Sequence, residues 1–314
     1  MDRKRIVMFF GKKRKEPDPF WDFGEKRSVY YDFFEKGLAL DLEIFLANGK
    51  ETYKKGLIFK NILKYEGDKI FKKISKEIEA DVVYDRSGGT FFPSENISSK
   101  VLNGIEFKRL CSDKFKMYEL LGDNYMKKTY LVEDVEMLRK VLLKLNSGSK
   151  YSLKPKNGLG GKGIFFGFSQ DLLKIELNKN TEYVLQEFID TSSGVEGIVG
   201  GLHDLRVVYV NGKIVWSHVR SPRKGSLLSN VSQGGTILEI SPGNIPEKIL
   251  EKSKLIREII EKKYGKVVFS IDFGIEEEEP FVFELNDQIG FPTEKMENKE
   301  LFINELYNML LSKI

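Results

Sequence analysis

Three oxygen-bearing side chains near the C-terminal end of the chain could bind a divalent cation. Asp272 lies in one apolar segment, and Glu284 and Asn286 lie two positions apart in the next one. Residues two apart in a strand face the same side. Two carboxylates and an amide oxygen suit the hard cation Mg²⁺. Because Phe283 and Leu285 between and beside them are apolar, we expect a metal site here, with a solvated hairpin as the alternative.

A glycine-rich turn follows Lys154. Residues 154–166 read KPKNGLGGKGIFF, and the turn contains Gly158, Gly160, Gly161 and Gly163. Glycine permits backbone conformations that let N–H groups approach phosphate oxygens. The turn leads into an apolar segment and lacks the GK[ST] ending of a Walker loop. We expect Lys154 to contact the α- and β-phosphates of a nucleotide as a point charge, under a lid formed by residues 156–163. The alternative is an ordinary surface lysine.

Two arginines lie at the ends of neighbouring apolar segments. Asp204 and Arg206 are two positions apart and therefore share one face of a strand. Arg220 ends the segment that follows. We expect Arg206 and Arg220 to neutralise a transferring phosphoryl group or an acidic substrate. Pairing between strands at the surface is the alternative.

In their order along the chain, these segments resemble the nucleotide site of the ATP-grasp superfamily. The glycine turn is followed by VLQEFID (184–190), HDLR (203–206), SHVRSP (217–222), SNVSQGG (229–235), and then IDFG and FVFELND within 271–287. The likeness covers roughly residues 100 to 291. It is greatest to the branch that holds the glutathione-synthetase-like and ribosomal-modification-ligase-like enzymes and their spore-coat-associated relatives. The order of the motifs carries the resemblance, and no single motif does.

The resemblance implies roles for further residues around a nucleotide. Lys114, in an Asp-Lys pair, would be a second phosphate contact, with a charge near a helix cap as the alternative. Adenine would be read by an extended segment, with the Glu187 and Phe188 backbones as candidates. The segment comprises Gln186, Glu187, Phe188 and Ile189, with Ile189 lining the base pocket. Glu196 lies where relatives often have a ribose-binding acid, although the preceding loop TSSGV is longer than usual.

The side of the site that binds the other substrates is less defined. Asn230 and the pair Gly234 and Gly235 resemble a loop near the acceptor, with Ser229, Ser232 and Gln233 as possible contacts. After Asn286, residues 287–291 read DQIGF where many relatives have small residues and a proline, so the acceptor is not identified. Arg86, followed by Ser87 and two glycines after a predicted strand, could form part of the substrate pocket. A polar turn is the alternative there.

The resemblance implies an ATP- and Mg²⁺-dependent ligase that joins a carboxylate to an amine, or to a thiol, through an acyl phosphate. Such catalysis consists of positioning and charge neutralisation and needs no protein nucleophile. Two Mg²⁺ ions are expected, and Mn²⁺ could replace them. The substrates would be small molecules, such as amino acids or a peptide terminus. An ATP-binding module without ligation and an ATP-dependent phosphotransferase remain as alternatives.

The segments that position these residues predict an α+β protein of the ATP-grasp fold, preceded by a small α/β pre-ATP-grasp domain. The expected parts are 1–110, a central subdomain with the glycine lid at 111–185, and a C-terminal subdomain with the metal site at 186–314. Apolar patterning predicts helices at 28–36, 69–79, 113–121 (capped by Ser112), 133–145, 170–178, 245–264 and 297–314. It predicts strands at 5–10, 40–45, 81–84, 152–155, 163–168, 184–189, 205–210, 213–220, 267–275 and 281–286.

Composition narrows the remaining possibilities. The chain has 51 basic and 47 acidic residues and a net charge of +4, a mixed surface on which no nucleic-acid binding is expected. No apolar run is long enough to span a membrane, and a cytoplasmic location is expected. The single Cys111 excludes an internal disulfide. The two histidines lack a serine or cysteine partner at a telling spacing, so packing roles are expected. The basic run 12–15 predicts a solvated loop, with an anion contact as the alternative.

Overall fold

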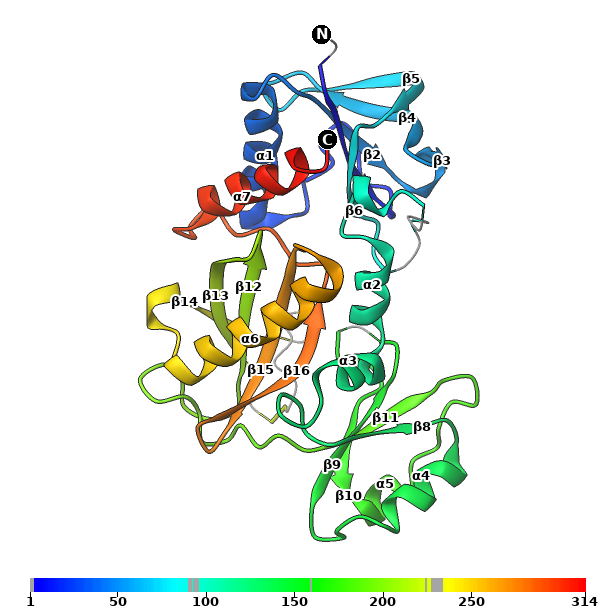
Figure 1. The fold of residues 1–314 in the computed structure, drawn as a ribbon, viewed down its shortest axis with the longest axis vertical. Helices are drawn as coiled ribbons and strands as arrows, with labels where there is room; N and C mark the ends of the chain where they lie inside the picture. The colour runs from blue at the N-terminus through cyan, green and yellow to red at the C-terminus, as the bar shows by residue number, and fades with distance from the viewer. Residues whose placement is uncertain (1–2, 90–91, 93–95, 159, 224, 227–233) are drawn as a thin grey trace.

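The computed structural model describes residues 3–89, 92, 96–158, 160–223, 225–226 and 234–314, and these residues form three sheets (Figure 1). A seven-stranded N-terminal sheet lies at one end of the molecule, a five-stranded sheet in the middle and a four-stranded sheet at the other end. The expected mixed α+β architecture is confirmed. Within the described residues, no helix is long and apolar enough to cross a membrane.

The N-terminal sheet is built around a buried parallel strand. The residues of β1 after Arg5 are buried, as expected for a strand covered on both faces. β1 pairs in parallel with both β2 and β6, and α1 (Arg27–Ala39) packs against this sheet. The strands are β1 (Arg5–Phe10), β2 (Glu43–Asn48), β3 (Tyr53–Lys55), β4 (Ile58–Tyr65), β5 (Phe71–Glu79), β6 (Val82–Arg86) and β7 (Val101–Leu102).

The helix expected at residues 69–79 is wrong. The segment forms β5, which pairs with β4 in an antiparallel hairpin. Phe71, Ile74 and Ile78 have the spacing of a helix face, but a register shift in β4 near Ile62 disturbs the simple alternation of the pair. A turn with positive φ at residues 67–69 precedes the strand, which favours a hairpin over a helix. The N-terminal domain is therefore not a simple strand–helix alternation.

The four-stranded sheet carries the glycine turn. Its order is β10-β9-β11-β8 and all its pairs are antiparallel. Asp113, and not the expected Ser112, caps the helix that begins at Lys114, because its carboxylate accepts the N–H groups of Phe115 and Lys116. The expected division between residues 185 and 186 falls inside β11. The elements are α2 (Ile105–Ser112), α3 (Lys114–Leu121), β8 (Thr129–Val132), α4 (Val135–Leu142), β9 (Lys150–Pro155), β10 (Phe165–Phe168), α5 (Ser169–Leu172) and β11 (Tyr183–Glu187).

The five-stranded sheet carries the acidic and basic residues singled out above. Its order is β14-β13-β12-β15-β16, and α6 (Glu247–Tyr264) packs against it. Asn211 and Gly212, both with positive φ, join β12 to β13 in a tight hairpin, as is typical of an Asn-Gly pair. The sequence patterns did not predict β14. The strands are β12 (Asp204–Val210), β13 (Lys213–Ser221), β14 (Thr236–Ile240), β15 (Phe269–Glu276) and β16 (Glu279–Asn286).

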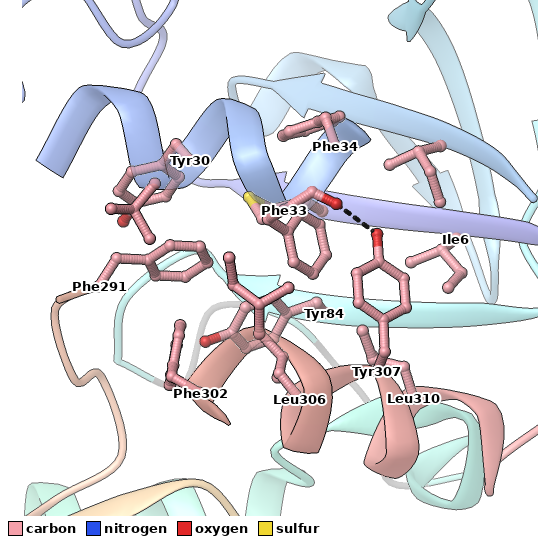
Figure 2. Packing of buried hydrophobic residues seen from close by; sticks show 14 of the residues in the cluster. Ile6, Tyr30, Phe33, Phe34, Tyr84, Phe291, Phe302, Leu306, Tyr307 and Leu310 are labelled. Atoms are coloured by element: carbon pink, nitrogen blue, oxygen red, sulfur yellow. Dashed lines mark hydrogen bonds between the residues drawn. The ribbon is translucent and has the colours of Figure 1, made fainter. Parts of the chain in front are cut away.

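The last helix returns to the N-terminal sheet. α7 (Lys299–Leu311) packs beside α1, and the Tyr307 hydroxyl donates to the Phe33 carbonyl at 2.7 Å (Figure 2). In the same cluster, Phe291 stacks on Tyr30 with 4.0 Å between ring centroids. The segment that follows β16 is therefore held against the N-terminal domain. Residues 287–291 and the part of the N-terminal domain that they contact are called the acceptor side below.

Candidate nucleotide and metal site

A pocket lies between the four-stranded and five-stranded sheets. Residues of both sheets line it, among them Lys154 of β9 and Glu284 of β16. Three aromatic rings, those of Phe166, Phe188 and Phe283, form part of its lining. Polar residues from separate elements, including Lys114, Lys154 and Glu284, also line it. The pocket thus combines apolar walls suited to a flat ring with charges suited to phosphates.

Lys154 is a buried cation in this pocket. Its Nζ donates to Gln186 Oε1 at 2.8 Å, and the Gln186 amide in turn donates to Thr129 Oγ1 at 3.0 Å. Burial, together with the nearby charge of Lys114, lowers the pKa of Lys154 to about 8. A desolvated ammonium without a carboxylate in contact favours the arrival of an anion. Gln186 therefore positions Lys154, and it also lines the pocket.

Lys114 reaches the same end of the pocket from the first turn of α3. Its Nζ donates to the Gly158 carbonyl at 2.8 Å, which ties the helix to the glycine turn. Burial lowers the pKa of Lys114, although Glu284 and Asp113 act in the opposite direction. The structure therefore brings the two predicted lysines together with Glu284, one of the predicted metal ligands.

The glycine turn has the backbone freedom that its sequence predicts. Gly160, Gly161 and Gly163 have φ near +70°, a conformation that other residues rarely adopt. Gly161 lines the pocket. A Cβ on Gly163 would lie 3.1 Å from the Pro155 ring, so this position is also tight. Leu159, the apolar residue of the expected lid, lies outside the described residues.

The backbone N–H groups predicted to donate to adenine already have other acceptors. The Glu187 N–H donates to the Lys128 carbonyl and the Phe188 N–H to the Lys150 carbonyl, both at 3.1 Å, so neither is free for a base. In an extended chain, the carbonyl of one residue and the N–H two residues later point to the same edge. The Glu187 carbonyl and the Ile189 N–H form such a pair. Ile189 lines the pocket as expected.

Glu196 does not join this pocket. The structure places it in a second groove with Glu277 and Glu278. A bridge between Val195 and Val199 folds this loop, and Glu196 lines the second groove and not the first pocket. Thr191, which sequence reasoning missed, lines the pocket instead. The unusual length of the loop before Glu196, TSSGV, is the feature of the sequence that indicates this different position of Glu196.

Two arginines and two aspartates form a buried network on the five-stranded sheet. Arg206 and Arg220 both bond Asp272, and Arg220 also bonds Asp204. Burial tends to raise the pKa of Asp272, but the two guanidinium groups outweigh it and hold the pKa below its usual value. Burial and the charge of Asp272 raise the pKa of Asp204. Asp204 also lines the pocket, a role that sequence reasoning did not assign.

The three predicted metal ligands converge. Asp272 on β15 is opposite Glu284 on β16, and the Asn286 amide lies 3.2 Å from Asp272 Oδ2 and 3.4 Å from Glu284 Oε1. Asp272 Oδ1 accepts one hydrogen bond, from Arg206 Nε, so it retains a free lone pair. The set of oxygen donors therefore fits a hard divalent cation once the amide presents its oxygen. Among the described residues, no group of three His, Cys, Asp or Glu side chains forms an alternative metal site.

The two histidines are buried, and His203 also lines the pocket. His203 Nδ1 donates to the Gly201 carbonyl and its Nε2 accepts the Ile275 N–H, which fixes a neutral ring. Burial, with Arg206 and Arg220 nearby, lowers the pKa of His218 to about 3. Burial raises the pKa of Cys111. The expected acceptor contacts Ser229, Asn230, Ser232 and Gln233 lie outside the described residues, and Gly234 and Gly235 lead into β14.

Known proteins resemble this chain in sequence and in fold. Residues 111–310 match the RimK-like ATP-grasp domain. The chain is 27% identical over 232 residues to the coenzyme gamma-F420-2:alpha-L-glutamate ligase of Methanocaldococcus jannaschii, covering 68% of this chain and 75% of that protein. It is 27% identical over 186 residues to a probable alpha-L-glutamate ligase of Cellvibrio japonicus, covering 57% of this chain and 56% of that protein.

The fold comparison extends over the whole chain. The RimK domain ATP-grasp protein of Sphaerobacter thermophilus matches with a TM-score of 0.60 and 12% identity, covering 100% of this chain and 99% of that one. At this identity the likeness establishes the fold, and the expected ATP-grasp fold is confirmed. The domain match covers more than half of the sequence. The chain therefore belongs to the RimK-like ATP-grasp family.

Proposed function

We propose that this chain is an ATP- and Mg²⁺-dependent ligase that joins the carboxylate of one substrate to the amino group of an amino acid, with L-glutamate as the first candidate. One observation carries the proposal: Lys114 and Lys154 lie at the end of an aromatic-lined pocket where Glu284 and the other candidate metal ligands also lie. The names of the two ligases matched in sequence support glutamate as the amine.

The nucleotide would bind with its base between the aromatic rings and its phosphates toward the lysines. The Glu187 carbonyl and the Ile189 N–H would pair with the adenine edge. Lys154 and Lys114 would contact the α- and β-phosphates, and backbone N–H groups at Gly160, Gly161 and Gly163 would approach the phosphate oxygens. Residues 156–163 would close over the phosphates and exclude water, which would otherwise hydrolyse the activated substrate.

Asp272, Glu284 and Asn286 would hold Mg²⁺, with two ions or Mn²⁺ as variants of the same site. The metal would neutralise charge on the phosphate oxygens during transfer. The remaining positive charge comes from the chain itself. Arg206 and Arg220, both bonded to Asp272, would bind the phosphoryl group that moves between substrates. Their role is electrostatic stabilisation of an anionic transition state.

The reaction would proceed in two displacements. A substrate carboxylate oxygen attacks the γ-phosphorus of ATP, and ADP leaves with the electrons of the broken P–O bond. The amino group then attacks the carbonyl carbon of the acyl phosphate, forming the amide. Inorganic phosphate leaves, and the proton lost from the amine passes to phosphate or solvent. The chain contributes positioning, charge and exclusion of water, and no side chain needs to form a covalent bond.

Product analysis tests this proposal. The protein is incubated with ATP, Mg²⁺, L-glutamate and a panel of carboxylates, amino acids and dipeptides. We expect ADP, inorganic phosphate and a new amide, identified by mass spectrometry. ADP with a phosphorylated hydroxyl product would indicate a phosphotransferase instead. Tight ATP binding without turnover across the panel would favour a binding module.

We also propose that the chain divides into the parts 1–110, 111–185 and 186–314. Limited proteolysis tests this division, because the protease should cut between the parts before it cuts within them.

A further inference from the structure

Two cations from the N-terminal domain flank one short segment on the acceptor side. Arg86, at the end of β6, donates from Nη1 to the Ile289 carbonyl at 2.6 Å. The ammonium of Lys26 lies 2.7 Å from the point where a Cβ on Gly290 would be placed. Glycine at position 290 therefore leaves room for Lys26 to approach the backbone. The two cations lie beside consecutive residues of the segment that follows the candidate metal ligands.

Arg86 is a partly buried charge, and none of its contacts with the described residues is with an acid. Its other contacts are with the hydroxyls of Tyr84 and Tyr30, at 3.3 and 3.5 Å, and with the faces of the Tyr84 and Phe291 rings (Figure 2 shows these three aromatic residues). Its Nε is buried and lacks a hydrogen-bond partner, and so does the neighbouring Ser87 Oγ. Within the part of the chain that the structure describes, no carboxylate forms an ion pair with it. A partly buried charge of this kind is costly unless something compensates it.

Lys26 is the second cation at this place. Partial burial, with the charges of Arg86 and Arg206, lowers the pKa of Lys26. The two arginines of the five-stranded sheet are balanced by Asp204 and Asp272, one acid for each. Across the residues described, no acidic side chain pairs with Lys26. Lys26 and Arg86 are therefore two cations on this side of the site that have no ion-pair partner among the described residues, while the nearby Asp85 and Asp287 share Lys108.

The position of these two cations suits a bound substrate. Phe10 and Arg86 are paired at the carboxyl ends of the parallel strands β1 and β6. Ligands of open α/β sheets bind at such ends. The segment contacted by both cations begins three residues after Asn286. A substrate whose reacting carboxylate lies near the metal ligands would therefore extend past Lys26 and Arg86.

We propose that Lys26 and Arg86 bind a second, non-reacting oxyanion of the acceptor substrate, a carboxylate or a phosphate. An arginine fork and a lysine point charge are the side chains that bind such groups. This inference rests on the proposed ligase function, because it assigns the acceptor of that reaction. It makes Lys26 and Arg86 residues that determine specificity, with no part in the transfer steps.

Calorimetry with paired probes tests the inference while ADP and Mg²⁺ fill the nucleotide site. Glutarate is compared with valerate, and 3-phosphonopropionate with propionate, so that each pair differs by one anionic group. We expect the unaltered protein to bind at least one dianion roughly tenfold or more tighter than its partner, as for a charged hydrogen bond. The Lys26→Gln variant should lose most of that preference. Lys254→Gln, an exposed lysine on α6, is the matched control and should keep it.

A second variant separates binding from folding. Arg86→Lys retains the positive charge but removes the planar guanidinium group with its paired N–H donors. We expect this variant to prefer the dianion over its monoanionic partner less strongly, while its affinity for ADP stays unchanged. Preference for glutarate alone assigns a carboxylate, and preference for 3-phosphonopropionate assigns a phosphate. If ADP binds normally but neither dianion is preferred, or if Lys26→Gln keeps the preference, the inference is overturned. Loss of the ligase function itself would appear instead in the product assay, where no amide would form.

Discussion

Arg206 binds Asp272 through two parallel hydrogen bonds, from Nε to Oδ1 at 2.6 Å and from Nη2 to Oδ2 at 2.5 Å. Arg220 donates to the same Oδ2 at 2.7 Å. Asp272 is therefore shared between two arginines and the candidate metal site. A cation that bound Asp272 would weaken these bonds and free guanidinium donors beside the phosphates. The carboxylate thus holds the arginines in place before the substrates arrive.

Removing the charge of Glu284 tests the metal site. Glu284→Gln keeps the shape of the side chain but removes a carboxylate ligand, so we expect ATP turnover to be lost while the circular dichroism spectrum is unchanged. Glu277→Gln, in the exposed turn before β16, is the control and should leave turnover unaffected. Near-normal turnover of Glu284→Gln at ordinary Mg²⁺ concentration would show that the metal binds elsewhere.

Lys154 should contribute to the binding of the phosphates and not to the binding of the base. We expect Lys154→Ala to weaken ATP by roughly 1.5–3 kcal/mol, as for a hydrogen bond to a charged group, and to leave adenosine nearly unchanged. Calorimetry with both ligands measures the difference. Lys174→Ala, at an exposed lysine that follows α5, provides the charge-matched control. An equal loss for ATP and adenosine would mean that Lys154 acts on the base or on the fold.

The lowered pKa of Lys154 predicts a pH dependence of nucleotide binding. Burial, with the charge of Lys114, lowers this pKa from 10.5 to about 8, so the side chain is cationic below that pH and neutral above it. ATP affinity should be full below about pH 8 and fall as the pH rises further. Binding above pH 8 should take up a proton, because the phosphates restore the charged form. Calorimetry in buffers of different ionisation enthalpy detects this uptake, and its absence in Lys154→Ala is the control.

The same shift has a consequence for stability. Between about pH 8 and 10.5 the unfolded chain carries a proton on Lys154 that the folded chain has lost. The free energy of unfolding should therefore rise with pH across this window, relative to a Lys154→Met variant. Denaturant unfolding of both proteins at several pH values measures the difference. A difference that is constant between pH 7 and 10 would contradict the lowered pKa.

Local patterns predicted the parts of the site that depend on a single segment. The glycines after Lys154 and the alternation of Glu284 and Asn286 required only the geometry of one turn and one strand. The hydrogen bonds of the Glu187 and Phe188 N–H groups could not be predicted from a single segment. Their acceptors are the carbonyls of Lys128 and Lys150, which lie in distant segments. We therefore propose the Ile189 N–H, and not that of Glu187 or Phe188, as the donor for adenine.

The errors in the fold have the same origin. Phe71, Ile74 and Ile78 have helical spacing, and only the pairing with β4 turns the segment into a strand. Phe291 and Tyr307 are apolar residues far from β1 in sequence, yet they complete the core beside α1. Nothing local to the C-terminal helix indicates that partner. Long-range contacts of this kind decide tertiary structure but leave no periodic signal.

Lys108 forms a buried ion pair with Asp85 and also lies 3.7 Å from Asp287, and its loss should destabilise the protein. Lys108 and Asp85 lie 2.6 Å apart with side chains 1% and 0% exposed. We expect Lys108→Met to cost about 3–5 kcal/mol, because it leaves a buried carboxylate uncompensated. The double variant with Asp85→Asn should recover part of the loss. Lys4→Met removes an exposed partner of Asp81 and should cost less than about 1 kcal/mol. Urea unfolding compares the variants, and equal costs at Lys108 and Lys4 would refute the burial argument.

The glycine turn should respond to the nucleotide. The turn between β9 and β10 contains glycines in left-handed conformations, and the Lys114 ammonium donates to the Gly158 carbonyl within it. The triphosphate would supply new acceptors for the N–H groups of this segment. Hydrogen exchange of peptides covering 156–163 should therefore slow when ATP and Mg²⁺ are added, whereas peptides from β5 should not change. Adenosine, which lacks the phosphates, should leave the exchange of the turn as it was. Equal protection with and without ATP would make the turn a fixed structural feature and remove its role as a lid.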